Sequence, residues 1–331
     1  LWNSSIGSTK RLSMFKFFYS FSIIIFGLSL GYAIQVLVNR NMVKLPISME
    51  RIRKILQRSA LLFVNPVAIV GAIWVVNIHN VRIVALPFLG LFALIMGGLL
   101  ALGAAKFLGM EPKKAGAMYG CGSFTNIGSI GALICFVFLG EPGFALVPIY
   151  KLFEEVSYYG IGFPIAKYYS GSAGTHEGKW NRLKGLAIDP FILVAVSSII
   201  LGGLLNFGSF ERPELYATIN RVFVPLGTIM MLASIGMALK YKRVLHYIKE
   251  CVDVSLIKFC IVPILASTLA LLIGFGKIDG GLPLKVVIIL SAMPVAFNAL
   301  IPPSIYDLDL DLANSCWFVT TALLIVVLPV L

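Results

Sequence analysis

Apolar runs long enough to cross a bilayer follow one another along almost the whole chain, separated by short polar connections. Ten such runs stand out, at about 14–38, 55–77, 81–105, 114–139, 142–168, 189–207, 216–239, 251–275, 283–306 and 311–331. A transmembrane helix needs roughly 20 mainly apolar residues. The pattern therefore predicts an all-α membrane protein with about ten transmembrane helices.

Basic residues gather in alternate connections. Those near 40–58, 106–114, 167–184 and 240–249 hold 17 Lys and Arg, and the other set holds 7. The positive-inside rule places the richer set in the cytoplasm and both termini outside. The longest polar connection, about 169–188, divides the runs into five and five. We expect a first five-helix repeat over 1–170, a cytoplasmic linker over 171–188 and a second repeat over 189–331. The repeats are inverted because each has an odd number of spans.

Composition agrees with a membrane protein. Hydrophobic residues make up 59% of the chain and charged residues 13%, against about 25% charged in soluble domains. The net charge of +12 lies in clusters between the apolar runs. It is therefore expected to set topology in a lipid bilayer, and we predict no nucleic-acid partner.

Several further expectations concern location and assembly. The first apolar run is long enough to be a span, so we expect no cleavable signal peptide, and the native start of a chain that begins with Leu1 is left open. The five cysteines lack metal-type spacing, so no metal site is predicted. We expect a protein of the bacterial inner (plasma) membrane. The sequence leaves open whether it forms a homodimer.

The fourth and ninth runs are the least suited to an uninterrupted helix. The fourth contains five glycines around a polar run, and the ninth contains Pro294, Pro302, Pro303 and Asn298. Proline inside a helix costs about 3 kcal/mol, and glycine costs about 1 kcal/mol relative to alanine. Broken helices at corresponding positions of two halves indicate a transporter binding site. The alternative is that the glycines only let helices pack closely.

Four stretches of the chain resemble the auxin efflux carrier family, which includes bacterial transporters for malonate and similar acids. They read GSFTNIGSIGALI, SAMPVAFNALIPPSIYDLDLDLANS, VPLGTIMMLASIGMALKY and LLFVNPVAIVGAIW. The resemblance implies two inverted repeats in which spans four and nine cross as broken helices. The same fold group contains bile-acid sodium symporters and sodium/proton antiporters. Asn126 stands at the family's span-four Asn and Pro294 at its crossover proline, so the resemblance implies a carboxylate substrate near their crossing.

The predicted substrate-binding residues lie in the two broken spans. They are Ser123, Thr125, Asn126, Gly128, Pro294 and Asn298. A short overlay of FTN on AFN aligns Asn126 with Asn298. One departure concerns a proline of the plant carriers, whose place here is taken by Leu133. Unwinding of the fourth span is therefore expected to depend on its glycines.

Other polar residues inside the apolar runs are further candidates. Glu154 and Glu155 are candidates for coupling a proton or a sodium ion, because carboxylates within a membrane are costly and usually functional. The alternative is a structural ion pair with Lys151, one helical turn away. Asn65 and Tyr158 are candidates for lining a cavity. Lys258 is expected to snorkel toward the end of its helix.

We therefore predict a secondary active transporter that moves a small organic anion by alternating access. No enzyme is predicted, and no catalytic residues, because His79, His176 and His246 all fall in connections and no hydrolase motif is present. No cofactor is predicted apart from a coupled Na⁺ or H⁺. The alternatives are a cation antiporter of the same fold and a membrane sensor that binds a ligand without transporting it.

Overall fold

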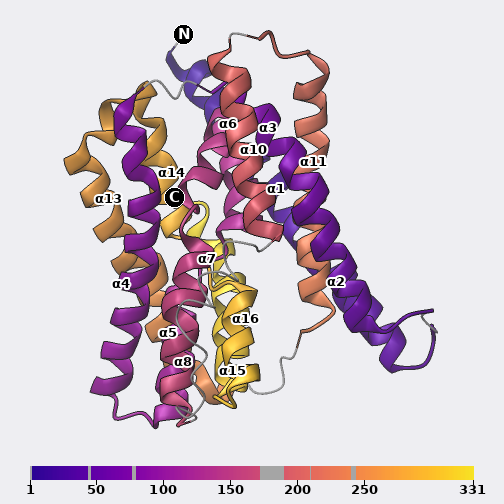
Figure 1. Ribbon diagram of the computed structural model, residues 1–331, viewed down its shortest axis with the longest axis vertical. Helices are drawn as coiled ribbons and strands as arrows, with labels where there is room; N and C mark the ends of the chain where they lie inside the picture. Colours follow the sequence, from indigo (N-terminus) through magenta and orange to yellow (C-terminus); the bar gives the residue numbers. More distant parts are fainter. Residues whose placement is uncertain (1, 44–45, 77–79, 172–189, 209, 240–243) are drawn as a thin grey trace.

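The computed structural model describes residues 2–43, 46–76, 80–171, 190–208, 210–239 and 244–331 (Figure 1). Regular secondary structure in these residues is helical, and one isolated backbone bridge joins Thr125 to Val295. The expected linker, apart from Gly171, lies outside the described residues, as do His79 and His176.

One group of helices, here called the first bundle, lies on the right in Figure 1. It consists of α1 (Trp2–Asn39), α2 (Met49–Ser59), the π-helical turn η1 (Ala60–Val64), α3 (Asn65–Ile73), α10 (Pro190–Phe207) and α11 (Leu215–Gly236). α11 packs against α1, α2 and α3, and α10 packs against α3. A Cβ at Gly31 of α1 would lie 2.0 Å from the carbonyl oxygen of Ala233, so this close approach requires glycine.

The remaining elements form the second bundle. Its first part consists of η2 (Val81–Ala85), α4 (Leu86–Phe107), α5 (Pro112–Ser123), η3 (Ile127–Gly131), α6 (Ala132–Tyr150), α7 (Glu154–Ser157), η4 (Tyr158–Gly162) and α8 (Phe163–Tyr169). Its second part consists of η5 (Val244–Tyr247), α12 (Ile248–Leu256), η6 (Ile257–Ile261), α13 (Val262–Ile273), η7 (Phe275–Lys277), η8 (Asp279–Gly281), α14 (Leu282–Ser291), η9 (Phe297–Leu300), α15 (Ile301–Ile305) and α16 (Leu310–Val327).

Packing within the second bundle joins segments that are far apart in the sequence. α4 packs against α5 and α13, α14 packs against α6 and α13, and α16 packs against α5 and α12. α6 bends at Gly140, whose φ is 72°, and it also contacts α1, α3, α10 and α11. α6 therefore joins the two bundles.

Seven helical segments of the described chain are long and apolar enough to cross a membrane. One of them, Ile127–Tyr169, bends at Gly140 and covers parts of the expected fourth and fifth spans. The described apolar part of α10, Leu193–Phe207, is shorter. The expected fourth and ninth spans do not qualify as continuous helices because both are interrupted. The all-helical, multi-pass prediction is thus confirmed, and the count of ten and the inverted repeats stay predictions.

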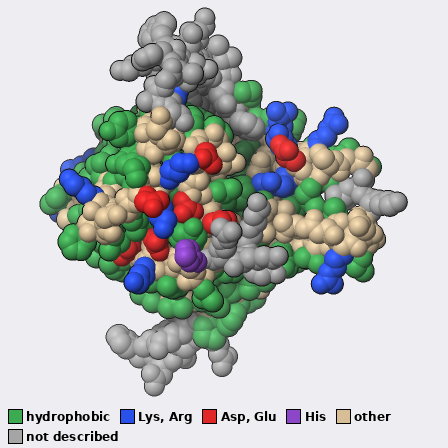
Figure 2. All heavy atoms as spheres, turned by 90° about the horizontal axis from the view of Figure 1, so that it is seen from below, with side chains coloured by type: hydrophobic (Ala, Val, Ile, Leu, Met, Phe, Trp, Pro, Cys, Tyr) green, Lys and Arg blue, Asp and Glu red, His purple; other side chains and the backbone are tan. Residues whose placement is uncertain are grey.

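Charged side chains mark one end of the molecule. Figure 2 looks at the lower end of Figure 1 and shows basic and acidic side chains there among apolar ones. Near the start of α5, Lys113 pairs with Asp307 at 2.5 Å, and this hydrogen-bonded ammonium lowers the pKa of the Asp307 carboxyl. Asp309 accepts hydrogen bonds from the Leu312 amide and from the Tyr247 hydroxyl, both at 2.9 Å, and so caps α16.

Candidate functional site

The two interrupted helices pair with each other through their backbones. α5 ends at Ser123, and Phe124 takes an extended conformation with φ −75° and ψ 119°. The Asn126 amide donates to the carbonyl of Pro294 at 2.9 Å, and the Ala296 amide donates to the carbonyl of Phe124 at 2.9 Å. Backbone groups without helical partners must be satisfied by other protein groups when they are buried. Each interruption therefore supplies partners for the other.

The first interruption does not depend on glycine conformation, contrary to the sequence-based expectation. Phe124 and Asn126 both have negative φ, and no glycine of the fourth span has a positive φ. Instead, the Asn126 Oδ1 accepts hydrogen bonds from the Ser129 Oγ at 2.5 Å and the Ile130 amide at 3.4 Å, which caps η3. At Gly122 the close-packing alternative holds, because a Cβ there would lie 2.2 Å from the Gly97 carbonyl oxygen.

The second interruption separates α14 from η9 and α15. Pro294 and Val295 lie in the non-helical stretch, and the Val295 amide donates to the Thr320 Oγ1 of α16 at 3.2 Å. Pro302 and Pro303 lie in the first turn of α15. The first turn of a helix tolerates proline because its amides have no helical partner. The prolines therefore fit the interruption that the sequence predicted here.

A polar network connects α7 to the first interruption. Glu154 is buried and forms an ion pair with Lys151 at 2.9 Å, so the structural alternative for this glutamate is observed. Its other oxygen accepts from the Tyr158 hydroxyl at 2.8 Å. That hydroxyl also accepts from the Thr125 amide at 3.0 Å, and the Tyr158 ring stacks on Phe124 with centroids 3.9 Å apart.

Lys258 does not snorkel, and this expectation is wrong. It lies in η6 with only 1% of its surface exposed. Its ammonium donates to the Thr125 Oγ1 at 2.5 Å and to the Ser123 carbonyl at 3.3 Å. The interior site is favourable because the last carbonyls of a helix have no helical partner and carry partial negative charge. Lys258 therefore satisfies a carbonyl at the C-terminal end of α5.

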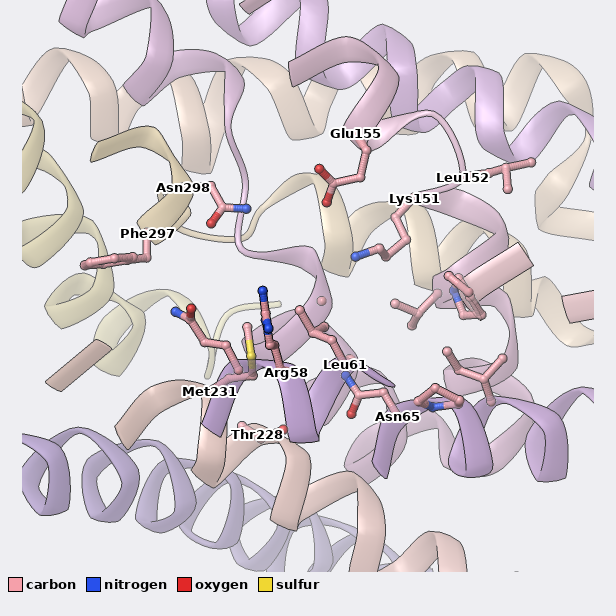
Figure 3. Close-up of a pocket in the computed structure, with 18 of the residues that line it drawn as sticks. Arg58, Leu61, Asn65, Lys151, Leu152, Glu155, Thr228, Met231, Phe297 and Asn298 are labelled. Carbon is pink, nitrogen blue, oxygen red and sulfur yellow. The ribbon is translucent and has the colours of Figure 1, made fainter. Parts of the chain in front are cut away.

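A cavity of about 490 Å³ lies between the two bundles. The first bundle supplies wall residues from α2, η1, α3, α10 and α11, and the second supplies them from η3, α6, α7, η4, η9 and α15. Figure 3 shows Arg58, Asn65, Lys151, Glu155 and Asn298 around one space. Because Lys54 and Arg58 are exposed, the cavity reaches solvent near α2.

The predicted site residues divide into two layers. Four of them line the cavity: Asn65, Gly128, Glu155 and Asn298. The others lie buried outside its lining, where the network and the paired interruptions surround them: Ser123, Thr125, Asn126, Glu154, Tyr158 and Pro294. Their backbone or side-chain groups are largely engaged by other protein groups, whereas Asn298 is exposed. Tyr159, next to Tyr158, lines the cavity in its place.

Sequence reasoning missed the basic residues that α2 contributes to the cavity wall. They are Arg53, Lys54 and Arg58. Lys54 pairs with Glu50 at 2.6 Å. Arg53 donates to the Ser234 carbonyl at 2.9 Å and lies over the Phe297 ring at 5.3 Å. The signal is a group of three arginines and a lysine at 51–58 in a short helix with a polar face, which the positive-inside rule relates to topology alone.

Arg58 is the basic group best placed to meet an anion. It lines the cavity, and no carboxylate within the described ranges lies within ion-pair distance of it. Lys151 also lines the cavity, but Glu154 lies behind it and balances its charge. The wall therefore combines the Arg58 guanidinium with amide groups from Asn65, Gln57 and Asn298.

At the end opposite α2, the bundles contact each other through charged groups. Arg212, just before α11, pairs with Glu141 at the bend of α6 and donates to the Gly71 carbonyl of α3 at 2.8 Å. Lys16 of α1 donates to the Phe138 carbonyl of α6 at 3.3 Å. Near the first interruption, the Thr228 hydroxyl of α11 donates to the Ser129 carbonyl at 3.3 Å.

Comparison with known proteins gives two relatives of similar length. An uncharacterized transporter of Methanothermobacter thermautotrophicus is 23% identical over 255 residues, which cover 75% of this chain and 77% of the relative. An uncharacterized transporter of Methanocaldococcus jannaschii is 28% identical over 251 residues, which cover 73% of each chain. No family model matches this chain.

The similarities and the seven apolar helices together support a multi-pass membrane transporter. Both relatives are described as transporters, which agrees with the prediction that the chain is not an enzyme. Both are archaeal, and the bacterial origin expected here stays a prediction, as do the orientation in the membrane and the auxin efflux carrier resemblance.

Proposed function

We propose that this protein is a secondary transporter for a small organic anion, with a carboxylate as the substrate class. The observation that carries the proposal is the cavity between the bundles, which exposes the Arg58 guanidinium beside amide side chains. Arginine binds a carboxylate through two parallel hydrogen bonds, and amide groups can add further contacts. The volume of about 490 Å³ lies within the usual range for small-molecule sites, about 300–1,000 Å³.

Alternating access is the proposed mechanism. Substrate that enters the cavity near α2 would contact both bundles at once, and movement of one bundle against the other would open the opposite end. Two arrangements support this mechanism. The contacts of Arg212 and Lys16 join the two bundles at the end away from α2. In addition, the first bundle contains the first two predicted spans of each sequence half, and the second bundle contains the last three of each half. Inverted repeats would produce this arrangement.

The paired interruptions have a supporting part in this proposal. They place η3 and η9 next to the cavity, where Gly128 and Asn298 form part of its wall. The other residues predicted for the site lie behind the cavity wall and hold the interruptions in position. Glu155 faces the cavity and stays a candidate for ion coupling, while Glu154 acts through its pair with Lys151.

Uptake into proteoliposomes tests the proposal. Labelled malonate and a labelled aromatic carboxylate are supplied, and flux is compared between the wild type, Arg58→Gln and Arg51→Gln. Arg51 is the matched control because it is an exposed arginine of α2 that does not line the cavity. We expect Arg58→Gln to lower flux by about tenfold or more, the effect of losing roughly 1.4 kcal/mol of binding, and Arg51→Gln to leave it unchanged.

The alternatives predict different results in the same vesicles. Movement of sodium and protons without any labelled acid would favour the cation antiporter. Binding of an acid without flux would favour the membrane sensor. An equal loss of flux in both arginine variants would assign the effect to the charge of α2 and contradict a role for Arg58 in the site.

A further inference from the structure

We infer that the ammonium of Lys258 is a built-in cation at the interruptions and occupies the place that a coupling sodium ion would take. The inference deepens the proposed function and rests on it, since coupling has meaning only for a transporter. It concerns the choice of coupling ion, which the sequence left open between Na⁺ and H⁺.

The surroundings of the Lys258 ammonium have the chemistry of a cation site. Its nitrogen lies 2.5 Å from a threonine hydroxyl and 3.3 Å from the carbonyl of Ser123, the last residue of α5. Unwound carbonyls and the C-terminal ends of half-helices are the groups that coordinate Na⁺ in transporters with broken helices. The C-terminal end of α5 adds partial negative charge at the same point. Lysine thus meets the groups that would otherwise attract a metal cation.

The Lys258 ammonium is buried, and a buried charge without a role would only lower stability. Lys258 is 1% exposed, in a segment apolar enough to cross a membrane. A charged group within the membrane is costly unless it is paired, and such residues usually have a function. Glu154, which pairs directly with Lys151, also reaches Thr125 through the Tyr158 hydroxyl. The carboxylate that balances Lys151 is thus linked to Lys258 through neutral groups, and the hydrogen-bond partners of the Lys258 ammonium are the neutral Thr125 hydroxyl and Ser123 carbonyl.

Thr125 makes the site sensitive to the position of both interruptions. Its hydroxyl accepts from Lys258 and lies 3.1 Å from the Ser123 carbonyl, to which it donates. Its backbone forms the bridge with Val295 of the other interrupted helix. A cation bound here therefore stabilises the paired state of the two helices. If lysine supplies that cation permanently, this pairing needs no sodium.

Thermal unfolding of the purified full chain in detergent tests the inference. The melting temperature is measured at equal ionic strength in sodium, potassium and choline chloride. We expect the wild type to melt at the same temperature in all three salts. Lys258→Ala should melt several degrees lower in choline chloride, and sodium should restore part of the loss by entering the vacated site. Lys285→Ala, which removes an exposed lysine, is the matched control and should show neither effect.

Adding Thr125→Val to Lys258→Ala should abolish the sodium response, because it removes the hydroxyl ligand. A sodium-specific rise in the melting temperature of the wild type would overturn the inference, and this measurement needs no variant. So would a Lys258→Ala protein that melts like the wild type, or one that is weakened but ignores sodium. None of these readings measures transport. Only the flux assay tests the organic-anion proposal, so its failure can be distinguished from failure of the inference about Lys258.

Discussion

The two bundles differ in how far their buried polar groups connect. Serine hydroxyls donate to carbonyls four residues earlier in both bundles, as Ser198 and Ser255 do, and in the first bundle the Gln57 amide donates to the Ser234 hydroxyl of another helix. In the second bundle, Lys258, Tyr158 and Thr125 bond to one another or to partners across different helices. Local bonds leave a helix independent of its neighbours, whereas a network fixes several elements together.

This difference suggests a division of labour. The first bundle contains a close glycine contact between α1 and α11, and packing of that kind is common between membrane helices. The second bundle contains both interruptions, and its network determines how they pair. The cavity lies where these two kinds of structure meet. Substitutions in the network should therefore cost more stability than substitutions on the cavity wall, which should cost mainly binding.

The largest expected effect comes from neutralising Glu154. Glu154→Gln leaves the Lys151 ammonium without its partner and weakens the Tyr158 contact. Breaking a fully buried ion pair costs about 3–5 kcal/mol. Because the Lys151 side chain is 25% exposed to the cavity, we expect a smaller loss in the free energy of unfolding, about 2–3 kcal/mol. Unfolding in detergent by increasing SDS measures it.

Glu155→Gln is the matched control for this experiment. Glu155 is the neighbouring residue and lines the cavity instead of the network. We expect the Glu155→Gln variant to change the pH dependence of flux with little loss of stability. Equal losses of stability in both variants would remove the distinction between network and wall.

A smaller effect should separate the two asparagines that the sequence aligned. Asn126→Ala removes the cap of η3, for which we expect a loss of about 1 kcal/mol in the free energy of unfolding. Asn298→Ala changes an exposed wall residue, so stability should fall by less than about 0.5 kcal/mol while the affinity for the transported acid falls. Thermal unfolding and binding of labelled malonate are measured on both. Should Asn126→Ala leave stability, binding and flux intact, the role of Asn126 in the site would be wrong.

An effect on stability as small as that of Asn126→Ala is expected at the contact between the bundles away from α2. Arg212→Gln removes the ion pair with Glu141, whose side chains are 14% and 16% exposed. The cost should be about 1 kcal/mol, the upper end of the range for pairs near a surface. The more informative measurement is how readily a reagent reaches the cavity, because weakening this contact should open the cavity at that end.

Labelling of an introduced cysteine measures this access. Ala132→Cys places a thiol on the cavity wall, and Cys260→Ala removes the exposed native cysteine. A membrane-impermeant thiol reagent added at the Arg212 end should label Arg212→Gln faster than the parent protein. Arg221→Gln, which changes an exposed arginine of α11, should leave the rate unchanged. Equal rates in all three proteins would show that Arg212 does not close this end.

Several features of the site could be predicted from the residue pattern. Pro294 and the glycine-rich fourth run indicated that both helices are interrupted, because these residues weaken helices wherever they stand. The ion pair of Lys151 with Glu154 was one of two alternatives, since their spacing places them one turn apart. The resemblance directed attention to Asn126, but it did not distinguish a residue that contacts substrate from one that caps a turn.

The all-helical, membrane-crossing class and the two segments where helices break follow from the residue pattern alone. These properties follow from the partition of each segment between water and lipid and from local backbone preferences, which depend on neighbouring residues alone. Only the tertiary packing sets the contact of Lys258 with Thr125, the position of Asn298 but not Asn126 on the cavity wall, and the position of Arg58 on the same wall as Asn298. These relations depend on how each helix is rotated and packed against segments more than a hundred residues away, which no local pattern specifies.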